Sequence, residues 1–580
     1  MCRTRGTGPA AARTLRFATR RESLDRYRTF LDGQQGLDAN PGGRAVRGAT
    51  SKSKPWNALV FLVTVVLPIG ACGSDDSGSS VRRSSLTIAR PQDVRDINPL
   101  RQANNATSEV TYQMHESLFG LSPDQEVIEV LATGWELLGD GLTYRLHLRE
   151  GVHFHSGAPF NAEAVAWNFE KQLKTEPLAI GSGLVPPYSE IDIVDEYTVD
   201  ITLEEPNGVF VNILAAPLLL MVDPSRYQEL GEDYNTNPSG TGPFKFVSWT
   251  PDQRVVLEAN TEYWDRDNGP GVAELIFEVI PEAAARIIAL RNGEVDMIFM
   301  VPAEDVSALD SHDDFTVVSY PSMRILYIGL NTADPILSDV RVRQALGHAM
   351  DREQVIQIIG ANGVRADGIG MPGALGFEPS ARDFDLDEAA RLLDEAGWLM
   401  NGDYREREGG RLSVRVLASA TVPGEIEALL VIQSQWKKAG IEMIIDQIES
   451  GARFALLNDE AGKHEEDPSY VPGYQAWTAG EGIRTGEIGY ITERPKCDQG
   501  ARGWERHCNP VFDAGFNLSQ SPAPLDERLN GYAAVNAVFF ESAIRLPVFV
   551  VQSNKAMADY VEGFIPNPND GLNLRGVTVR

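Results

Sequence analysis

The sequence is short of cysteine, of positive charge and of long apolar segments. Its 580 residues include four Cys, and 52 Lys and Arg stand against 82 Asp and Glu, which gives a formal net charge of −30 at pH 7. An acidic surface repels nucleic acid and anionic lipid head groups, which argues against both as partners. A chain of this length exceeds what one hydrophobic core supports, so two or more domains are expected.

Signatures of catalysis are missing as well. No serine stands in a GxSxG frame, and His464-Glu465-Glu466 lacks the second histidine of an HExxH zinc site. These absences argue against an extracytoplasmic hydrolase. The prediction is therefore a binding protein with no catalytic residues, no metal ligands and no cofactor.

The one segment apolar enough to enter a bilayer is Trp56–Ile69, and it is shorter than the roughly 20 residues that a membrane-spanning helix needs. Two lysines precede it, which is the order of charge and apolar core typical of a signal peptide. The next residues, Ile69-Gly70-Ala71-Cys72, resemble the bacterial lipobox, in which the cysteine is lipidated and becomes the first mature residue. An ordinary cleavable signal with a chance cysteine is the alternative.

The start of the chain is thereby divided into three segments. Residues 55–71 are predicted to be a lipoprotein signal peptide, and residues 72–83, rich in Gly and Ser, a flexible tether. Residues 1–54 form a basic extension of formal charge +8, which leaves −38 for the rest of the chain. The extension precedes a complete signal peptide, so one hypothesis is that translation starts later, at the codon for Leu37 or Val46. A real cytoplasmic extension is the alternative.

The cysteines agree with export. Cys2 lies in the basic extension and Cys72 would carry lipid, which leaves Cys497 and Cys508 as a pair. In an oxidising compartment such a pair is expected to form a disulfide. A metal site at the same place would need further soft ligands, and His507 alone does not supply them.

Strands and helices alternate along the chain, which indicates α/β architecture. Thr143–Leu148 alternates strictly in polarity and predicts a half-buried strand. Asn161 is placed to cap a following helix. A helix is also expected at Glu109–Leu118, and further helices at 387–396 and 426–439 are each followed by a glycine.

Three local motifs are predicted to serve the fold rather than to bind metal or to catalyse a reaction. Gly240-Thr241-Gly242 lies between two prolines and predicts a turn in which glycine supplies positive φ. His153 and His155 share a strand face and form an HxH pattern that can bind metal, but a strand-and-turn element is the favoured interpretation. Asp296 is expected to accept structural hydrogen bonds rather than to act as an acid.

The stretch Trp135–Ala162, WELLGDGLTYRLHLREGVHFHSGAPFNA, closely resembles the signature of the family-5 extracytoplasmic solute-binding proteins. Further resemblances follow in family order at 96–100, 240–244 (GTGPF), 260–264 (NTEYW), 290–298, 330–352, 389–397, 433–444 and 543–550. They span about residues 84–580. The family contains receptors for oligopeptides, dipeptides and nickel chelates, which serve ABC importers.

The resemblance implies a two-lobed fold like that of periplasmic binding proteins, of the large peptide-receptor type (class II), with a hinge between the lobes. Residues 84–330 and 540–580 would form the first lobe, with an extra subdomain at about 130–235. Residues 331–539 would form the second lobe. A monomer is expected, anchored by lipid on the outer side of the cell membrane.

The resemblance also implies where ligand binds. Peptide receptors of this family sandwich an extended ligand between backbone segments of both lobes. One segment maps to Ala103, Asn104 and Asn105. The other surrounds a tryptophan and maps to the stretch that contains Tyr474, Trp477, Thr478, Gly480 and Glu481. Trp477 is predicted to line the pocket, with core packing as the alternative.

One position departs from the family pattern. The aspartate that pairs with the ligand's α-ammonium stands three residues after the tryptophan, and here that residue is Gly480. Either Glu481 replaces it, or the ligand has no free α-amine at that place; the second interpretation is slightly favoured, since a one-residue step turns the side chain to the other face.

The function that the resemblance implies is capture of a small peptide-like solute for an ABC permease and its ATPases. The same fold also serves receptors for non-peptide solutes, such as glycans or metal chelates. A sensor or chaperone without a transport role is a third possibility that the sequence leaves open.

Overall fold

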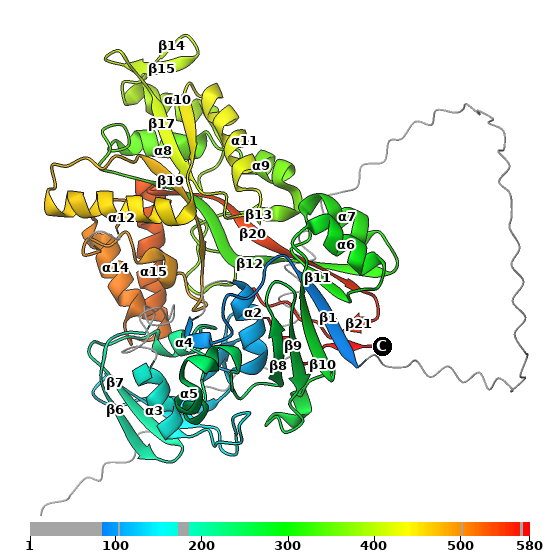
Figure 1. The fold of residues 1–580 in the computed structure, drawn as a ribbon. Helices are drawn as coiled ribbons and strands as arrows, with labels where there is room; N and C mark the ends of the chain where they lie inside the picture. The colour runs from blue at the N-terminus through cyan, green and yellow to red at the C-terminus, as the bar shows by residue number, and fades with distance from the viewer. Residues whose placement is uncertain (1–83, 102–104, 172–184, 500–502, 569–571) are drawn as a thin grey trace, which may run out of the picture. The chain divides into compact units, whose positions relative to one another are not determined.

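The computed structural model describes residues 84–580 apart from 102–104, 172–184, 500–502 and 569–571. Val81–Arg580 forms one compact unit, which contains all the elements described below (Figure 1). The predicted extension, signal peptide, lipidation site Cys72 and tether lie outside the described residues. Among the helices of the described ranges, none has both the length and the apolar character to cross a membrane.

The largest element is an eleven-stranded mixed sheet within the described residues. Its strands lie in the order β18 (Glu442–Gln447), β17 (Ser413–Ala418), β19 (Ala476–Gly482), β12 (Phe315–Leu330), β20 (Arg545–Ala558), β11 (Met297–Phe299), β1 (Ser85–Arg90), β10 (Glu274–Val279), β9 (Arg254–Ala259) and β8 (Phe244–Thr250), and β13 (Gly363–Arg365) pairs with β20 beside this path. Helices and strands alternate along the chain, which confirms the predicted α/β class.

Two long strands join the halves of this sheet. β12 and β20 pair antiparallel from Phe315 opposite Ala558 to Gly329 opposite Arg545. At one end β20 pairs with β11, and at the other β12 pairs with β19. In Figure 1 the green β12 and the red β20 run together from the β1–β10 half to the β17–β19 half. The chain crosses between the halves in these strands, as the predicted hinge requires; the exact lobe boundaries stay a prediction.

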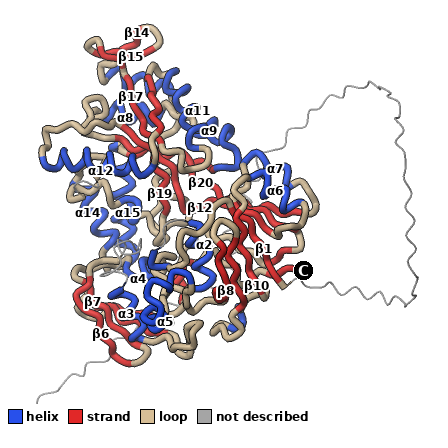
Figure 2. Tube along the Cα trace, in the orientation of Figure 1, coloured by secondary structure: helices blue, strands red, loops and turns tan. Residues whose placement is uncertain are grey.

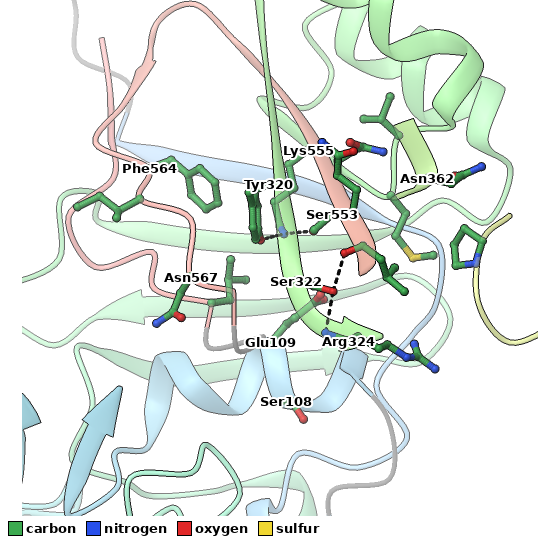
Figure 3. Close-up of a pocket in the computed structure, with 18 of the residues that line it drawn as sticks. Ser108, Glu109, Tyr320, Ser322, Arg324, Asn362, Ser553, Lys555, Phe564 and Asn567 are labelled. Carbon is green, nitrogen blue, oxygen red and sulfur yellow. Dashed lines mark hydrogen bonds between the residues drawn. The ribbon is translucent and has the colours of Figure 1, made fainter. Parts of the chain in front are cut away.

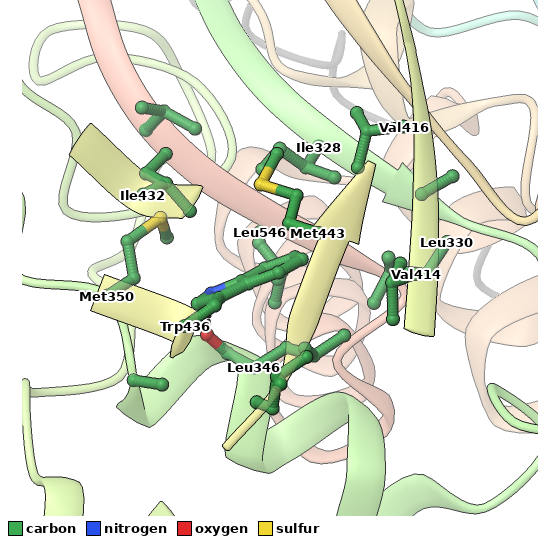
Figure 4. Close-up of a cluster of buried hydrophobic side chains, with 14 of the residues drawn as sticks. Ile328, Leu330, Leu346, Met350, Val414, Val416, Ile432, Trp436, Met443 and Leu546 are labelled. Carbon is green, nitrogen blue, oxygen red and sulfur yellow. Dashed lines mark hydrogen bonds between the residues drawn. The ribbon is translucent and has the colours of Figure 1, made fainter. Parts of the chain in front are cut away.

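The β17–β19 half has a core of its own. Its helices are α8 (Val340–His348), α9 (Arg352–Ile359), α10 (Leu386–Glu395) and α11 (Glu425–Lys438), and Figure 2 shows them beside these strands. Aspartates begin three of them, because the side chains of Asp339, Asp351 and Asp385 accept hydrogen bonds from first-turn N–H groups. Trp436 lies fully buried among the aliphatic side chains of this core (Figure 4), and its Nε1 donates to the Leu346 carbonyl at 3.1 Å.

A second, smaller sheet has the order β4 (Ala132–Leu137), β5 (Thr143–Leu148), β7 (Thr198–Leu203) and β6 (Tyr188–Asp195). The predicted alternation in β5 is confirmed, because Tyr144, Leu146 and Leu148 are buried. α3 (Ala162–Glu170), α4 (Phe210–Leu214) and α5 (Pro224–Leu230) accompany the sheet. Asn161 caps α3 as predicted, since its Oδ1 accepts from the Ala164 N–H at 3.1 Å.

The GTGPF motif has a different physical role from the predicted one. Neither Gly240 nor Gly242 adopts positive φ. A Cβ on Gly240 would lie 2.2 Å from the Met114 carbonyl oxygen, and one on Gly242 would lie 2.6 Å from the Met114 carbonyl carbon. The prediction of positive φ is therefore wrong, because these glycines are needed for close approach of two backbones.

That contact also ends the helix α2 (Asn105–Met114), which was predicted at Glu109–Leu118. The Gly242 N–H donates to the Met114 carbonyl at 2.9 Å. His155 contacts this turn from another segment, with its N–H donating to the Gly240 carbonyl at 2.8 Å. His155 thus has a structural role. Among the described residues no group of three His, Cys, Asp or Glu is placed to bind a metal, and the absence of a metal site stays a prediction.

Asp296 is structural as expected, because its carboxylate accepts from the Thr87 N–H at 2.8 Å and from the Tyr560 hydroxyl at 2.9 Å. The remaining helices are α6 (Ala283–Arg291), α7 (Ala303–Asp310), α12 (Ser450–Glu466), α13 (Gly489–Thr492), α14 (Pro510–Gln520) and α15 (Leu525–Ser542). The short strands are β2 (Phe119–Leu121), β3 (Val127–Glu129), β14 (Leu399–Asn401), β15 (Tyr404–Arg407), β16 (Gly410–Arg411), β21 (Val561–Glu562) and β22 (Thr578–Val579).

Candidate functional site

A cavity of about 240 Å³ lies where β12 and β20 pass between the halves (Figure 3). Its walls come from α2, from the loop after β11, from β12 and β20, from loops of the β17–β19 half and from the segment after β21. The lining residues that carry polar side chains are Ser108, Glu109, Tyr112, Tyr320, Ser322, Arg324, Asn362, Arg484, Gln552, Ser553, Asn554, Lys555 and Asn567. The cavity thus collects segments that are up to several hundred residues apart in sequence.

An irregularity in β12 shapes the floor of the cavity. Pairing with β20 shifts between Pro321 and Ile325, so the intervening residues leave the regular register. Such a bulge re-aims side chains out of the sheet. Ser322 uses its hydroxyl to donate to the Val551 carbonyl at 2.8 Å, and Arg324 donates from Nε to the Gly480 carbonyl at 3.1 Å. Both residues line the cavity.

Helix α2 supplies one wall through Ser108, Glu109 and Tyr112. The Glu109 carboxylate forms an ion pair with Arg90 at 3.0 Å. Of the predicted ligand segment that precedes this wall, Ala103 and Asn104 lie outside the described residues. Asn105 is the first residue of α2. Their contact with ligand stays a prediction, but the helix that they lead into borders the cavity.

The opposite wall comes from the β17–β19 half through Asn362, Pro423 and Arg484. Gly424 has φ +80°, and a Cβ there would lie 3.1 Å from the Asn362 Cβ. The glycine therefore permits the turn and the close approach that bring Pro423 beside Asn362. Met300, on the β11 loop, completes the rim with φ 55°, a left-handed conformation that costs a non-glycine residue free energy and is often kept at binding sites.

Lys555 is the most deeply buried cation of the cavity, with 7% of its surface exposed. Its ammonium donates to the Tyr320 hydroxyl at 2.5 Å and to the Ser553 hydroxyl at 2.9 Å. The rings of Tyr320 and Phe299 lie 4.8 and 5.1 Å away. Figure 3 shows the ammonium between the two hydroxyl groups.

Three residues of the other predicted ligand segment are core residues. Tyr474, Trp477 and Thr478 are each at most 1% exposed and do not line the cavity. The Trp477 ring packs edge-on against Tyr474 and Trp504, which is the core-packing arrangement. The Thr478 hydroxyl donates to Glu425 at 2.6 Å. Direct ligand contact by these side chains stays a prediction.

Gly480 and Glu481 lie nearer the cavity, on the end of β19. Beyond Trp477, β19 has no partner strand on the side opposite β12 in the described part of the sheet. The Gly480 carbonyl on this stretch accepts from Arg324. The Glu481 carboxylate lies 2.9 Å from Arg494 and 3.8 Å from Arg545, so a ligand ammonium would compete with two guanidinium groups for it.

Behind Glu481 stands a buried ion network. Arg545 and Glu505 have fully buried side chains and are joined at 2.5 Å. Burial lowers the pKa of Arg545, but Glu505, Tyr327 and Glu481 outweigh it, so the net pKa is raised above the ordinary value of arginine. Glu505 lies in the loop that Cys497 and Cys508 close as a disulfide, the pairing predicted from the sequence.

Sequence reasoning missed Lys555, Arg324 and Arg484, the three cations among the residues that line the cavity. Lys555 follows three polar residues, Gln552, Ser553 and Asn554, which come after the apolar run at 546–551, and it lies on the largely buried strand β20. A lysine in that position needs a polar partner or a function. Arg484 follows β19 in a loop, and no local pattern distinguishes it from a surface arginine.

A larger hollow of about 790 Å³ lies between the smaller sheet and α14. It is bordered by Val185, the first described residue after a gap at 172–184, and by Asp498, close to a second gap. Its walls come from neither β12 nor β20. The cavity at the crossing strands is therefore the better candidate for a ligand site.

Comparison with known proteins agrees with this geometry. Residues 126–478 match the bacterial extracellular solute-binding proteins, family 5 (middle part). The chain is 28% identical over 522 residues to the glutathione-binding protein GsiB of Salmonella typhi. The matched region covers 90% of this chain and 97% of that protein. The chain is 27% identical over 494 residues to GsiB of Escherichia coli O1:K1 / APEC, with 85% and 92% covered.

Solved structures share the fold. NikA from Brucella suis, in complex with Fe(III)-EDTA, superposes with a TM-score of 0.75 at 23% identity, covering 86% of this chain and all of NikA. DppA from Helicobacter pylori, in complex with the peptide STSA, gives 0.68 at 20% identity, with 86% and 98% covered. The predicted two-lobed α/β fold of the periplasmic binding proteins is thereby confirmed. The chain belongs to family 5 of the bacterial extracellular solute-binding proteins, acts outside the cytoplasm as the substrate-binding component of an ABC importer, and is not an enzyme.

Proposed function

We propose that this protein captures small peptide-like solutes in the cavity at the crossing strands and delivers them to a membrane permease, while a lipid on Cys72 holds it at the cell membrane. The observation that carries the proposal is the composition of the cavity wall. Ser108 and Glu109 come from one half of the molecule, and Asn362, Pro423 and Arg484 from the other. A solute that contacts both walls stabilises their approach.

The crossing strands make such closure physically reasonable. β12 and β20 form the floor of the cavity, and β12 carries the register shift between Pro321 and Ile325. Irregular strand segments absorb dihedral changes with little loss of pairing, which suits a hinge. Ligand that prefers the closed form shifts the population toward it by its differential affinity. A closed and loaded receptor is the form that a permease would recognise.

The peptide character of the solute rests on two supports. The first is the side of β19 beyond Trp477, which has no partner strand among the described residues; a ligand backbone that pairs there would replace the side chains of Arg453 and Arg324, which donate to the Thr478 and Gly480 carbonyls. The second is the similarity over nearly the whole chain to proteins named for glutathione, a small peptide. Gly480 gives no carboxylate for an α-ammonium, so backbone pairing and other side chains would determine the orientation of the ligand.

The binding part of the proposal is tested by thermal and urea unfolding of a soluble form that begins at Gly73. A mixture of di- and tripeptides at about 100 times Kd adds about 2.7 kcal/mol to the free energy of unfolding. A rise in the midpoint that depends on peptide concentration is the expected result. No rise with any peptide, together with stabilisation by a glycan or a metal chelate, would replace the peptide by a non-peptide solute.

The anchoring and delivery parts have their own tests. Cys72→Ala is expected to move the protein from the membrane fraction to the soluble fraction, because the acyl chains supply the membrane affinity. Deletion of the gene should abolish uptake of the solutes that the purified protein binds. Unchanged uptake of all of them would contradict delivery and favour a sensor of the same fold.

A further inference from the structure

The cavity has the opposite charge balance from the rest of the molecule. The chain carries a formal charge of −30, yet three cations and one carboxylate line the cavity, namely Lys555, Arg324, Arg484 and Glu109. The carboxylate forms an ion pair with Arg90, which lies outside the lining. Among the described residues that line the cavity, the positive charges therefore exceed the negative charge.

Lys555 shows this imbalance most clearly. No carboxylate in the described residues lies within ion-pair distance of its ammonium, and its hydrogen-bond acceptors there are the neutral hydroxyl groups of Tyr320 and Ser553. An ammonium has three donors, so two acceptors leave one donor unused. A cation that is 93% buried and has no counter-ion among the described residues costs free energy, and an anion in the cavity would offset that cost.

Arg484 repeats the pattern from the other wall. In the described part of the chain its guanidinium has neither an ion pair nor a hydrogen bond, although it is partly buried and lines the cavity. A guanidinium presents donors in a planar fork that fits a carboxylate at two points. The two cations thus come from different parts of the cavity lining, one on the crossing strand β20 and one in the loop after β19.

We propose that the cavity selects small solutes that carry a free carboxylate, which the ammonium of Lys555 and the guanidinium of Arg484 bind, and that net-negative solutes are preferred over cationic ones. The inference rests on the proposed capture of peptide-like solutes and names their class. The volume of about 240 Å³ is just below the usual range of roughly 300–1,000 Å³ for ligand pockets, so it suits two or three residues better than a long peptide.

The test measures binding by titration calorimetry with matched tripeptides. Ala-Ala-Ala, its N-acetyl form and its C-terminal amide differ in charge and hardly in shape, and glutathione adds a second carboxylate. The amide is expected to bind at least tenfold more weakly than the free acid. The acetylated peptide, which keeps the carboxylate and loses the ammonium, should bind as well as the free acid or better, and glutathione should bind most tightly.

Two variants connect this selectivity to the cavity. Lys555→Met keeps the aliphatic length, and Arg484→Gln keeps a polar side chain; each should weaken binding of the free acid about 10- to 100-fold and remove its advantage over the amide. Arg411→Gln is the matched control, since it removes the same charge at an exposed ion pair with Glu442, away from the cavity. Its affinities should equal those of the unchanged protein.

The outcomes separate this inference from the proposed function. If a peptide binds equally well as the free acid and as the amide, both to the variants and to the unchanged protein, the carboxylate site is overturned and peptide capture remains. If no peptide binds, citrate is the next probe. If citrate binds and both Lys555→Met and Arg484→Gln weaken its binding, the carboxylate site is upheld although peptide capture fails. If neither peptides nor citrate bind, the carboxylate site and peptide capture are both overturned.

Discussion

Basic side chains are buried in two regions of this protein in two different ways. Around Arg545, the guanidinium meets Glu505 at 2.5 Å and Glu481 at 3.8 Å, and Arg494 shares the second carboxylate. Around Lys555, the neighbours are hydroxyl groups and aromatic rings. We call the first region the paired network and the second the open cavity.

We infer from this difference which charges serve the fold and which are balanced by a ligand. A buried ion pair whose partners satisfy one another contributes little net free energy, but loss of one partner leaves an isolated charge at high cost. In the paired network that partner is part of the chain. In the open cavity we infer that the solute supplies it, so the two regions should respond in opposite ways to removal of a charge.

The largest effect is expected from Glu505→Gln in the paired network. The change leaves Arg545 buried without its nearest carboxylate and should lower the free energy of unfolding by about 3–5 kcal/mol. Urea unfolding of the ligand-free protein measures it, with Glu442→Gln at an exposed ion pair as the control, where almost no change is expected. A loss below about 1 kcal/mol for Glu505→Gln would show that the network is not held by charge compensation.

Removal of the disulfide should come next. Cys497→Ser with Cys508→Ser opens the loop that carries Glu505, and closing a loop of this length is worth about 3 kcal/mol in the chain-entropy model. Peptide affinity should change little, because the loop does not line the cavity. A tenfold loss of affinity at unchanged stability would mean that the paired network controls the site after all.

A third kind of buried basic group stays neutral in the folded protein, and low pH should reveal it through the free energy of unfolding. Burial, and next the charge of His155, lower the pKa of His115 to about 3. The unfolded chain then binds more protons than the folded one between that pKa and about 6.5, so stability falls as pH falls through this window.

From pH 7 to pH 5 the expected loss attributable to His115 is about 2 kcal/mol, since one pKa unit corresponds to about 1.4 kcal/mol. Unfolding curves at both pH values for the unchanged protein and for His115→Gln measure it as the difference in slope with pH. Equal pH dependence of the two proteins would place the acid sensitivity in other groups.

The smallest effect is expected in the open cavity. Lys555→Met removes a buried cation that has no carboxylate partner among the described residues, so the free energy of unfolding without ligand should stay within about 1 kcal/mol of the original value or rise. The same urea titration used for Glu505→Gln measures it. A loss larger than about 2 kcal/mol would make Lys555 a structural residue and remove the contrast between the regions.

Much of the fold was predictable because it rests on local chemistry. The alternation of Thr143–Leu148, the cap at Asn161 and the glycines that follow α10 and α11 depend on neighbours within a few residues. The role of Gly240 and Gly242 was not predictable in the same way. Their need for space comes from Met114, which is distant in sequence and reaches them only in the folded chain.

For the site, a motif pointed to the stretch from Tyr474 to Glu481, whose contact with ligand stays a prediction. In the structure the Gly480 carbonyl of that stretch accepts from Arg324, which lines the cavity. Burial of Trp477 against Trp504 depends on the disulfide loop, and no local pattern reports it.

By itself, the sequence determined the α/β class, the family, the pairing of Cys497 with Cys508 and the absence of known catalytic motifs, since each of these is written in residue types and their spacing. The tertiary structure decided which charges are balanced. A side chain's partner is set by contacts between distant segments, such as Lys555 with Tyr320 or Arg545 with Glu505. Charge compensation acts over a few ångströms in space, and only the folded chain brings those groups within that range.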